Sequence, residues 1–486
     1  MKKFLLTATF LVAFASSAFA GGILTNTNQS VTFLRMLARD GAIGIDGVYS
    51  NPAGVAFLDP GFHISLNWQS AWQTRTITTT NPLFALGVNN NGAVTKTFEG
   101  KARAPFIPSI QAAYNTDKWS FQFGFAVSGG GGKCEFDDGL GSFEGAVAQI
   151  AGALKPFGVT GYDMTSMLQG DQFYFGFTLG AAYKVTDNLS VYGGLRALYG
   201  TASYKAKIEN IEVMVVNTPK PTPFGTFLDG INASYAQLKQ MYEKYGDAIG
   251  PENVAKYRTL EAAMPQIEKL EVYRNGVNLQ SDQTGFGIAP IIGIDYKTGK
   301  FNFAAKYEFR THMGMKNKST LTEAIAVEAA NQFLDGTTVR EDSPALLTLG
   351  AEYSILPNLR VDAGYHHFYD KQSAKYGNKQ DLLKGGTNEY LGGIEYDATD
   401  KLTVSGGFQI TKYGLSDEYM NDISFVVNSW TFGLGAKYKF NDKIALNVAY
   451  FQTNYGDYNT AASSLGVQNS FTRTNYVVGA GVDFTF

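Results

Sequence analysis

Apolar and polar residues alternate along most of this chain with a period of two. At the C-terminal end, every second residue from Tyr476 to Phe486 is apolar, and the residues between them are mostly small or polar. The same alternation runs through residues 119–127, 301–310 and 402–411. It indicates strands with one face toward an apolar medium and the other toward water or small side chains. Strands of soluble proteins average about 5–6 residues, and these runs are longer, so the pattern favours a membrane β-barrel over a soluble β-sandwich.

The connections between the alternating runs are of two kinds. Very short polar links, each joining two runs into a hairpin, occur at 116–118, 186–188, 298–300, 357–358, 398–401 and 441–443. Longer polar or glycine-rich segments lie at about 78–104, 129–170, 207–282, 315–339, 373–384, 414–423 and 457–469. Short turns at one end and long loops at the other are typical of outer-membrane barrels. We therefore predict an all-β fold in which residues 61–486 form fourteen antiparallel transmembrane strands.

Residues 1–20 have the features of an export signal. Lys2 and Lys3 precede an apolar stretch, and Ala18-Phe19-Ala20 has the small-residue pattern of a cleavage site. The alternative is an N-terminal membrane anchor, which the short apolar core disfavours. No later run is long and apolar enough to span a bilayer as a helix. We predict a cleaved signal peptide and an exported protein.

Two further segments lack the strand pattern. Residues 21–60 precede the first predicted strand, have helical character over 31–38, and are then broken by glycines. A segment of this length at the periplasmic end of a barrel can plug its lumen. Within the loop 207–282, residues 234–270 place apolar side chains at helical spacing. We predict a plug at 21–60 and a long extracellular loop that contains amphipathic helices.

The composition fits a membrane protein and excludes several other classes. Charged residues make up 17% of the chain and aromatic residues 14%, whereas soluble domains carry about 25% charged residues. A mean hydropathy of −0.12 is too polar for a bundle of membrane helices. A net charge of −3 disfavours a nucleic-acid-binding protein. The single cysteine, Cys134, excludes an intrachain disulfide framework and any multi-cysteine metal site.

No residue pattern points to catalysis. The chain has four histidines, and two of them, His366 and His367, are adjacent in a predicted strand. Their side chains therefore point to opposite faces and cannot share a metal ion. Motifs of serine hydrolases, zinc proteases and dinucleotide-binding folds are absent. We expect a protein that is not an enzyme and that uses no cofactor and no metal.

Four segments together match a known pattern. Two of them, Tyr49-Ser50-Asn51-Pro52-Ala53-Gly54 and Phe57-Leu58-Asp59-Pro60, lead into the first strand. The third segment, residues 104–108, leads into the second strand. The fourth, residues 117–125, contains the following turn and the third strand. With the strand number and the terminal Phe486, they resemble the FadL family of outer-membrane transporters for long-chain fatty acids and, in one branch, aromatic hydrocarbons. The resemblance implies an N-terminal hatch inside the barrel, with Asn51, Pro52, Ala53 and Gly54 as its signature residues.

The resemblance also implies a route for the ligand. The ligand lands on an apolar patch among the outer loops, occupies an interior pocket, and leaves sideways through a gap made by a kink in the third strand. Here that strand, residues 119–127, runs into Gly129, Gly130, Gly131 and Gly132. Glycines tolerate the backbone of a kink that interrupts a ladder. The alternative is that this run is the flexible start of the following loop.

Members of the family hold the ligand headgroup with basic residues near the outer ends of the fifth and ninth strands. The matching positions here are Lys205 and Lys375. Lys205 would face the lumen only if a bulge near Gly200 shifted the strand register. By strict alternation, the cations that point inward are Arg196, Arg310 and His312. Each of them either contacts the ligand or has a structural role, in which it pairs with a charge in the lumen. The candidate headgroup residues are therefore Lys205, Lys375, Arg196 and Arg310.

The expected function is passive uptake of hydrophobic small molecules, long-chain fatty acids first, across the outer membrane of a Gram-negative bacterium. Aromatic hydrocarbons are alternative ligands, and they need no cation in the lumen. A surface receptor or adhesin that binds its partner through residues 207–282 is a second alternative. The expected partners are the hydrophobic ligand and outer-membrane lipid, without nucleic acid. A closed barrel needs no second copy to cover its edges, which favours a monomer.

Overall fold

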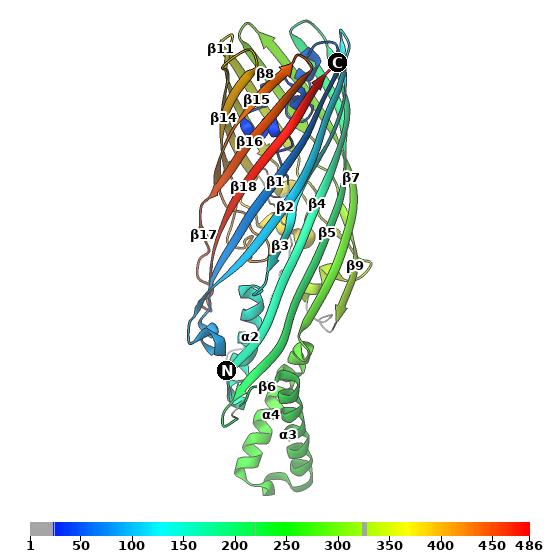
Figure 1. Ribbon diagram of the computed structural model, residues 1–486. Coiled ribbons are helices and arrows are strands. Elements are labelled where there is room, and N and C mark those ends of the chain that lie inside the picture. Colours follow the sequence, from blue (N-terminus) through cyan, green and yellow to red (C-terminus); the bar gives the residue numbers. More distant parts are fainter. Residues whose placement is uncertain (1–22, 24, 219, 323–327) are drawn as a thin grey trace.

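The computed structural model describes residue 23 and residues 25–218, 220–322 and 328–486, so the predicted signal peptide, 1–20, lies outside the described residues. Most of the chain forms one antiparallel sheet that closes on itself, because β18 (Gln468–Thr485) pairs with β1 (Gly61–Thr80), as Figure 1 shows. The remaining wall strands are β2 (Thr95–Asn115), β3 (Trp119–Phe136), β4 (Val159–Lys184), β5 (Leu189–Val215), β7 (Val277–Thr298), β8 (Phe301–Glu308) continued by β9 (Gly314–Thr322), β10 (Thr338–Arg340) continued by β11 (Leu346–Leu356), β12 (Leu359–Phe368), β13 (Thr387–Asp397), β14 (Leu402–Lys412), β15 (Ser429–Asn441) and β16 (Ile444–Tyr455). The predicted fourteen-stranded barrel is confirmed.

Short turns join the wall strands at one end of the barrel, at the positions predicted from the sequence. Phe62 and Phe486 exchange backbone hydrogen bonds at this end, so the barrel begins and ends there. At the opposite end the strands are longer than predicted: β3 continues to Phe136 and β5 to Val215. Backbone pairing continues past the membrane, where a strand needs no apolar face. Alternation of side chains therefore underestimates the length of these strands.

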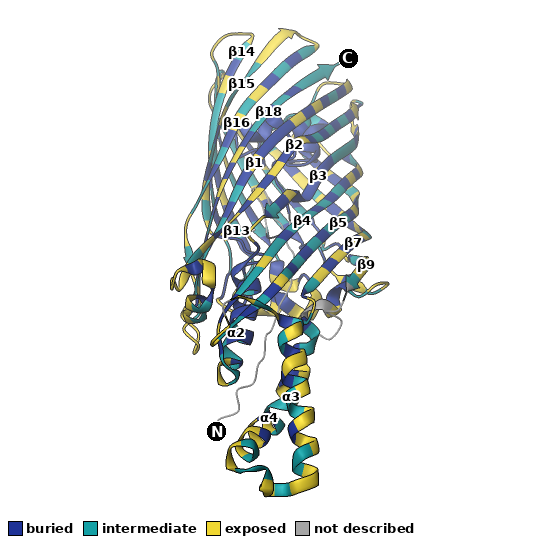
Figure 2. Cartoon of the chain, turned by 60° about the horizontal axis from the view of Figure 1, so that its bottom comes forward, coloured by how far each residue is buried: buried dark blue, intermediate teal, exposed yellow. Residues whose placement is uncertain are grey.

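Burial alternates along each wall strand in bands (Figure 2). In β7, for example, Phe286 and Ile288 are exposed on the outer face, whereas Ser281 and Ala289 are fully buried on the inner face. Toward the long-loop end the outward residues of β7 become polar, as at Asp282. The exposed apolar face is the part of the wall that fits the hydrocarbon layer of a membrane.

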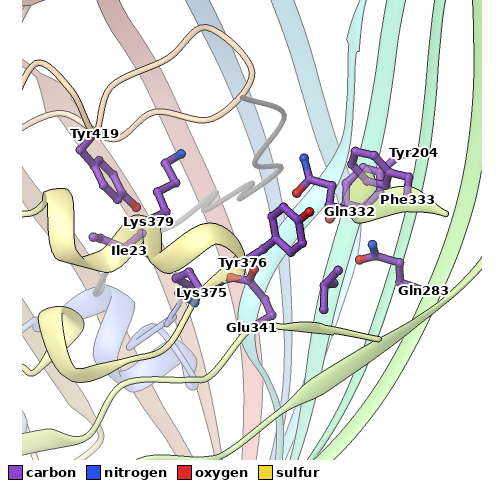
Figure 3. A pocket seen from close by; sticks show the side chains of 11 residues that line it. Ile23, Tyr204, Gln283, Gln332, Phe333, Glu341, Lys375, Tyr376, Lys379 and Tyr419 are labelled. Atoms are coloured by element: carbon purple, nitrogen blue, oxygen red, sulfur yellow. Dashed lines mark hydrogen bonds and ion pairs between the residues drawn. The ribbon is translucent and has the colours of Figure 1, made fainter. Parts of the chain in front are cut away.

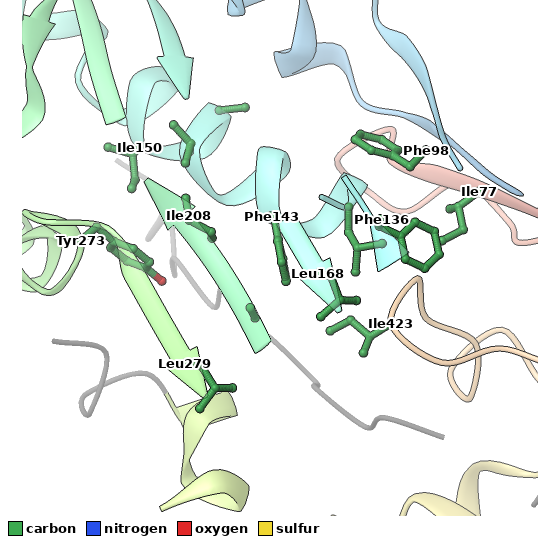
Figure 4. Packing of buried hydrophobic residues seen from close by; sticks show 14 of the residues in the cluster. Ile77, Phe98, Phe136, Phe143, Ile150, Leu168, Ile208, Tyr273, Leu279 and Ile423 are labelled. Atoms are coloured by element: carbon green, nitrogen blue, oxygen red, sulfur yellow. The ribbon is translucent and has the colours of Figure 1, made fainter. Parts of the chain in front are cut away.

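Helices occur only in the connections at the long-loop end and in the lumen of the described chain. α2 (Gly141–Ala153) buries Phe143, Val147 and Ile150 in one apolar cluster with inward wall residues such as Leu168 of β4, part of which Figure 4 shows. α3 (Phe224–Tyr245) and α4 (Pro251–Leu270) form a hairpin that projects beyond the wall (Figure 1). None of the helices among the described residues is both long and apolar enough to cross a bilayer.

Residues 25–60, which we call the hatch, lie inside the barrel in the half nearer the short turns (Figure 1). The hatch contains α1 (Val31–Arg35) and two short turns of 3-10 helix, η1 (Ile45–Val48) and η2 (Gly54–Phe57). The Oγ atom of Ser30 caps α1 by accepting a hydrogen bond from the backbone N–H of Phe33 at 3.0 Å. α1 ends earlier than the predicted helical stretch, because Met36 is extended.

Inward-facing glycines allow the backbone of the hatch to touch the wall. A Cβ atom at Gly407 of β14 would collide with the backbone nitrogen of Leu37. A Cβ atom at Gly433 of β15 would collide with the carbonyl oxygen of Leu34. Any larger residue at these positions would push the hatch away from this side of the barrel.

Candidate ligand pocket and wall opening

Buried charges hold one side of the hatch against the wall. Arg35 pairs with Glu395 of β13 at 2.5 Å. His366 of β12 lies between Asp40 of the hatch, at 3.0 Å, and Glu389 of β13, at 2.8 Å. These side chains are almost completely shielded from water. Because breaking a buried pair leaves an uncompensated charge, this side of the hatch is strongly held.

The hatch signature attaches the hatch to the wall at the short-turn end. The signature residues are Asn51, Pro52, Ala53 and Gly54. Nδ2 of Asn51 donates to Asp295 of β7 at 2.6 Å, and Oδ1 of Asn51 accepts from the N–H of Gly54 at 3.1 Å. The carbonyl oxygens of Pro52 and Ala53 accept from Gln122 of β3 and Ser190 of β5, both at 2.7 Å. The signature therefore binds three wall strands by hydrogen bonds that depend on its backbone shape.

The ladder between β2 and β3 is interrupted. Arg103 pairs with Lys133, and Ser109 pairs with Ala126, but residues 104–108 of β2 and 127–132 of β3 do not pair with each other. The four glycines that we predicted to form the kink, residues 129–132, lie in this part of β3. They therefore belong to the strand and not to the following loop. Gly130 has a φ of 77°, and a Cβ atom there would collide with the carbonyl oxygen of Gln172 in β4. Only glycine fits this backbone.

The first residues of the hatch lie beside the part of β3 that is not paired with β2. Thr25 forms an antiparallel bridge with Gly129. The backbone N–H of Asn26 donates to the carbonyl oxygen of Ser128 at 2.9 Å, and Nδ2 of Asn26 donates to that of Gly130 at 2.9 Å. The hatch thus satisfies the hydrogen bonds of the kinked segment in place of the neighbouring wall strand.

Apolar side chains line the interruption on both sides of the wall. Ala104 and Ile107 of β2 and Val127 of β3 are buried in one cluster with Phe33 of the hatch. Phe106 of β2 is exposed on the outer side. An apolar molecule that crossed the wall here would contact these apolar side chains.

A small cavity of about 30 Å³ lies in the lumen toward the long-loop end, and its lining residues form the pocket of Figure 3. Ile23, two positions before the first residue of the hatch, forms part of the wall of the pocket. The aromatic and basic residues of the lining are Tyr204, Phe333, Tyr376, Tyr419, Lys375 and Lys379. Lys379 and Tyr419 lie on one side of the pocket, and Tyr204 and Phe333 lie on the other (Figure 3). The lining combines aromatic rings with charged and amide side chains. Because the cavity has room for about one water molecule, a larger ligand enters only when lining side chains move apart.

The two lysines of the pocket differ in their partners. Nζ of Lys375 pairs with Glu341 at 2.7 Å and donates to the carbonyl oxygen of Asp342 at 2.8 Å. Nζ of Lys379 is buried, has no hydrogen-bond partner among the described residues, and lies 4.7 Å from the centre of the Tyr419 ring. Burial lowers the pKa of Lys379 to about 8. A carboxylate in the pocket would supply the partner that this ammonium lacks.

Two of the predicted headgroup residues, Arg196 and Lys205, do not line the pocket. Arg196 points into the lumen, as alternation predicts, but it pairs with Glu308 at 2.9 Å and its guanidinium lies over the ring of Tyr49 in the hatch. Lys205 faces outward, because no bulge interrupts the β4–β5 ladder in this region and its neighbour Tyr204 points inward. The prediction that Lys205 reaches the lumen is wrong.

The prediction that Arg310 and His312 point inward is also wrong. Between β8 and β9 the chain has one residue more than the facing part of β7, which shifts the alternation. Glu308 and Met313 are therefore both buried, although five positions apart, and the side chain of His312 is 64% exposed. Arg310 contacts His312 on this outer face. Strand alternation by itself cannot reveal a single extra residue between two strand segments.

Sequence reasoning did not single out Lys379 or Asn26. Lys379 lies in η10 (Tyr376–Leu382), a 3-10 segment in which no alternation indicates the direction of a side chain. Asn26 belongs to a polar run whose role depends on the kinked part of β3. No three His, Cys, Asp or Glu side chains converge as a metal site within the described residues.

An open groove lies among the outer connections. Its apolar lining includes Phe157 from the β3–β4 connection, Phe227 and Ile231 from α3, and Leu260 from α4. It faces outward at the base of the helical hairpin and is separate from the pocket in the lumen.

Comparison with known proteins identifies the fold. The family model of the outer membrane protein beta-barrel domain matches residues 324–484. Among curated proteins, none matches this chain. A FadL homologue of Pseudomonas aeruginosa aligns with a TM-score of 0.62 at 13% identity, over 97% of this chain and 100% of its own. The toluene transporters TodX of P. putida and TbuX of Ralstonia pickettii align with TM-scores of 0.52 and 0.50 at 14% and 16% identity, each over 91% of this chain and 94% of the other. This chain is an outer-membrane β-barrel with the FadL fold.

The FadL fold extends beyond the part that the family model matches. That part contains the strands from β10 to β18 and most of the pocket lining, whereas the hatch, the kinked strand β3 and the pocket residue Tyr204 of β5 precede it. The alignment with the FadL homologue covers nearly the whole chain. The fold-level similarity therefore includes the regions that hold the pocket and the wall interruption.

Proposed function

We propose that this protein takes up hydrophobic small molecules with an acidic headgroup, long-chain fatty acids first, across the outer membrane. The observation that carries the proposal is the buried ammonium of Lys379, which lacks a hydrogen-bond partner among the described residues of an aromatic pocket. An apolar tail would be buried against side chains such as Tyr204 and Phe333, and the carboxylate would pair with Lys379. The FadL homologue and the toluene transporters that share the fold support the broader function of hydrophobic uptake.

The route runs from the outer groove to the pocket and then to the interrupted wall. The apolar groove at Phe227 and Leu260 receives the ligand from the outside. The ligand then occupies the pocket, where Ile23 forms part of the lining. Because Ile23 lies two and three positions before Thr25 and Asn26, its displacement acts directly on the contacts that cover the kinked part of β3. Release of these contacts opens a sideways path between β2 and β3.

Uptake of labelled oleate tests the headgroup role. Cells that lack their own fatty-acid transporter would express the wild type, Lys379→Met or Lys384→Met, with folding checked by the mobility of the unheated protein in a gel. Lys379→Met should lower uptake by about tenfold, because it removes a charge-assisted contact. Lys384, an exposed lysine just beyond the same 3-10 segment, serves as the control and should be replaceable without effect. Normal uptake by Lys379→Met would refute the headgroup role, and no uptake by folded wild type would refute the fatty-acid proposal.

Aromatic hydrocarbons are the alternative ligands within the same function. The aromatic lining of the pocket and the fold shared with two toluene transporters favour them. Toluene has no charge, so Lys379→Met should leave its uptake unchanged or raise it. Uptake of toluene but not of oleate by the wild type would make this alternative the function.

The sideways exit has its own test. Replacing Gly129, Gly130, Gly131 and Gly132 by Thr-Val-Thr-Val should favour a regular strand, because a side chain at Gly130 cannot adopt the kinked backbone. We expect a folded barrel that binds oleate but no longer delivers it to the cell. Normal delivery by this variant would refute an exit at the interruption.

A surface-binding function is the second candidate, and the projecting α3–α4 hairpin favours it (Figure 1). Residues 224–273 would be replaced by a short Gly-Ser linker, which leaves β5 and β7 intact. Loss of attachment to a surface or partner with normal uptake would support the receptor function. Loss of uptake would instead support a landing role for the groove at the base of the hairpin.

A further inference from the structure

The regular strand pairing of the wall is interrupted in two neighbouring strands at the same level along the barrel axis. The chain leaves the regular ladder at residues 309–313, between β8 and β9, and at 341–345, between β10 and β11. The two breaks lie side by side, since Thr311 and Ser343 exchange backbone hydrogen bonds of 3.1 and 3.0 Å. The break shifts the alternation of inward and outward residues, so side chains that a regular strand would turn into the lumen reach the outer face.

Three basic side chains gather on the outer face of these breaks: Arg310, His312 and Arg340. Arg340 points outward, because its neighbours Val339 and Glu341 both line the pocket in the lumen. The side chains of Arg310, His312 and Arg340 are 36%, 64% and 52% exposed. We call these three residues, with Asp342, the outer basic cluster.

The outer basic cluster contains one carboxylate for its three basic groups. Asp342 is fully buried beneath them, 2.8 Å from Arg340, 3.3 Å from His312 and 3.8 Å from Arg310. Nη2 of Arg310 lies 3.3 Å from Nε2 of His312, and Nη2 of Arg340 lies 3.2 Å from Nδ1 of the same ring. A guanidinium only donates and a neutral imidazole accepts at one nitrogen only, so at least one of these contacts places two donors face to face. An anion on the outer face would accept hydrogen bonds from both donors of such a contact.

The cluster lies at the outer edge of the apolar surface of the wall. Phe286 of β7, Gly314 of β9 and Arg340 of β10 occupy one row across three strands. From Phe286 toward the short turns the outward residues of β7 are apolar, whereas toward the long loops they are polar. Arg340 therefore stands where the hydrocarbon layer ends on the long-loop, extracellular side.

Further cations extend the cluster away from the apolar belt. Lys316 and Lys318 of β9 are exposed on the outer face, since Met315 and Asn317 between and beside them are buried. Lys318 lies opposite Asp282 of β7. Lys316 lies beside Thr338 and forms no ion pair within the described part of the chain. The patch thus has an excess of positive charge directly beyond an apolar surface.

We propose that the outer basic cluster, with Lys316, binds a phosphate group on a lipid of the outer leaflet. Such a lipid places its acyl chains along Phe286 and the apolar residues below it, and its phosphate beside Arg310, His312 and Arg340. Guanidinium and ammonium groups at a membrane surface are suited to this chemistry, because charge-assisted hydrogen bonds to phosphate are strong. The proposal depends on the position of the barrel in the membrane and not on the identity of the transported ligand.

Native mass spectrometry of the purified protein in a nonionic detergent tests the proposal. The probes are a bis-phosphorylated lipid A and the same lipid with its phosphates removed. Arg310→Gln/His312→Gln/Lys316→Gln leaves Arg340 to pair with Asp342, so the buried carboxylate keeps a partner. The control, Lys300→Gln/Lys401→Gln/Lys443→Gln, removes three exposed lysines at the short-turn end. We expect lipid A to be retained about tenfold less by the first variant and equally by the control.

Retention of lipid A by the triple variant at the level of the wild type would overturn the proposal. A second measurement needs no variant: wild type should retain the dephosphorylated lipid about tenfold less than lipid A, and added salt should reduce the difference. Equal retention of the two lipids would show that acyl chains alone account for binding and would also overturn the proposal. Equal losses in the variant and in the control would refute a localised site.

Discussion

Asp40 of the hatch and His366 of the wall lie 3.0 Å apart in the interior of the barrel, and the second ring nitrogen of His366 lies 2.8 Å from Glu389. An ionised carboxylate only accepts hydrogen bonds, so both contacts are satisfied together when both ring nitrogens carry a proton. The imidazolium then balances part of the charge of two buried acids. This contact joins the hatch to strands β12 and β13 of the wall.

Replacing His366 by alanine should loosen the hatch. The change leaves Asp40 and Glu389 buried without their shared partner, and loss of one member of a buried charged pair costs about 3 kcal/mol. We expect urea unfolding of the refolded barrel at a lower midpoint and a higher ion conductance in planar bilayers. His367→Ala is the matched control, because His367 is the next residue of the same strand and bonds Asn388 away from the hatch. Equal behaviour of the two variants would show that the Asp40–His366 contact does not hold the hatch.

The conductance of the barrel should also respond to the glycines that face the hatch. Gly407→Val places a Cβ atom against the backbone nitrogen of Leu37, whereas Gly392→Val places one in open space on the neighbouring strand. Valine is favoured in strands, so the wall should tolerate both changes. We expect Gly407→Val to displace the hatch and raise the conductance, and Gly392→Val to behave as the wild type. A closed Gly407→Val barrel would contradict the close docking of the hatch.

Ligand binding should depend on pH through Lys379, which lies in an outer connection. Burial lowers its pKa from 10.5 to about 8. The unfolded chain therefore binds more protons between about pH 8 and 10.5, and the stability contributed by this group rises with pH across that window. Binding of a carboxylate has the opposite dependence, because it needs the charged ammonium.

We expect oleate to bind more weakly as the pH rises above about 8. Titration of labelled oleate into the detergent-solubilised protein at neutral and at alkaline pH measures this change. Lys379→Met should bind weakly at both pH values and lose the dependence. An unchanged pH dependence in this variant would assign the effect to another group.

A disulfide between the hatch and β3 should block transport. Thr25 and Gly129 form an antiparallel bridge, and paired residues of this kind have Cα atoms about 4.5–5.5 Å apart, which a disulfide can span. Thr25→Cys/Gly129→Cys would be made with Cys134→Ser, so that no other cysteine competes. We expect oxidised cells to lose oleate uptake and reductant to restore it.

The control for the disulfide carries Thr25→Cys and Cys134→Ser only. It should transport oleate with and without reductant. Full uptake by a completely cross-linked protein would show that the hatch does not have to leave the kinked part of β3.

The strand number, the turn positions and the glycine run were evident in the sequence, because they depend on local properties. A strand between lipid and lumen repeats every two residues, a tight turn needs only a few polar residues, and the kink at Gly130 needs a residue without a side chain. The tertiary structure decided which groups meet in the lumen. Lys375 was singled out from the sequence but already has Glu341 as its partner, whereas Lys379 was not singled out and lacks one among the described residues.

The same distinction explains the outward cations. One extra residue between β8 and β9 turns Arg310 and His312 to the outer face, and only the pairing of that segment with β7 and β10 reveals it. Asp40 and His366 also meet in the lumen, although they are 326 residues apart in the sequence. Local patterns determined that this chain forms a barrel with a plug. The partner of each buried charge was decided only when closure of the barrel brought distant residues together, because such contacts depend on the register of many strands at once.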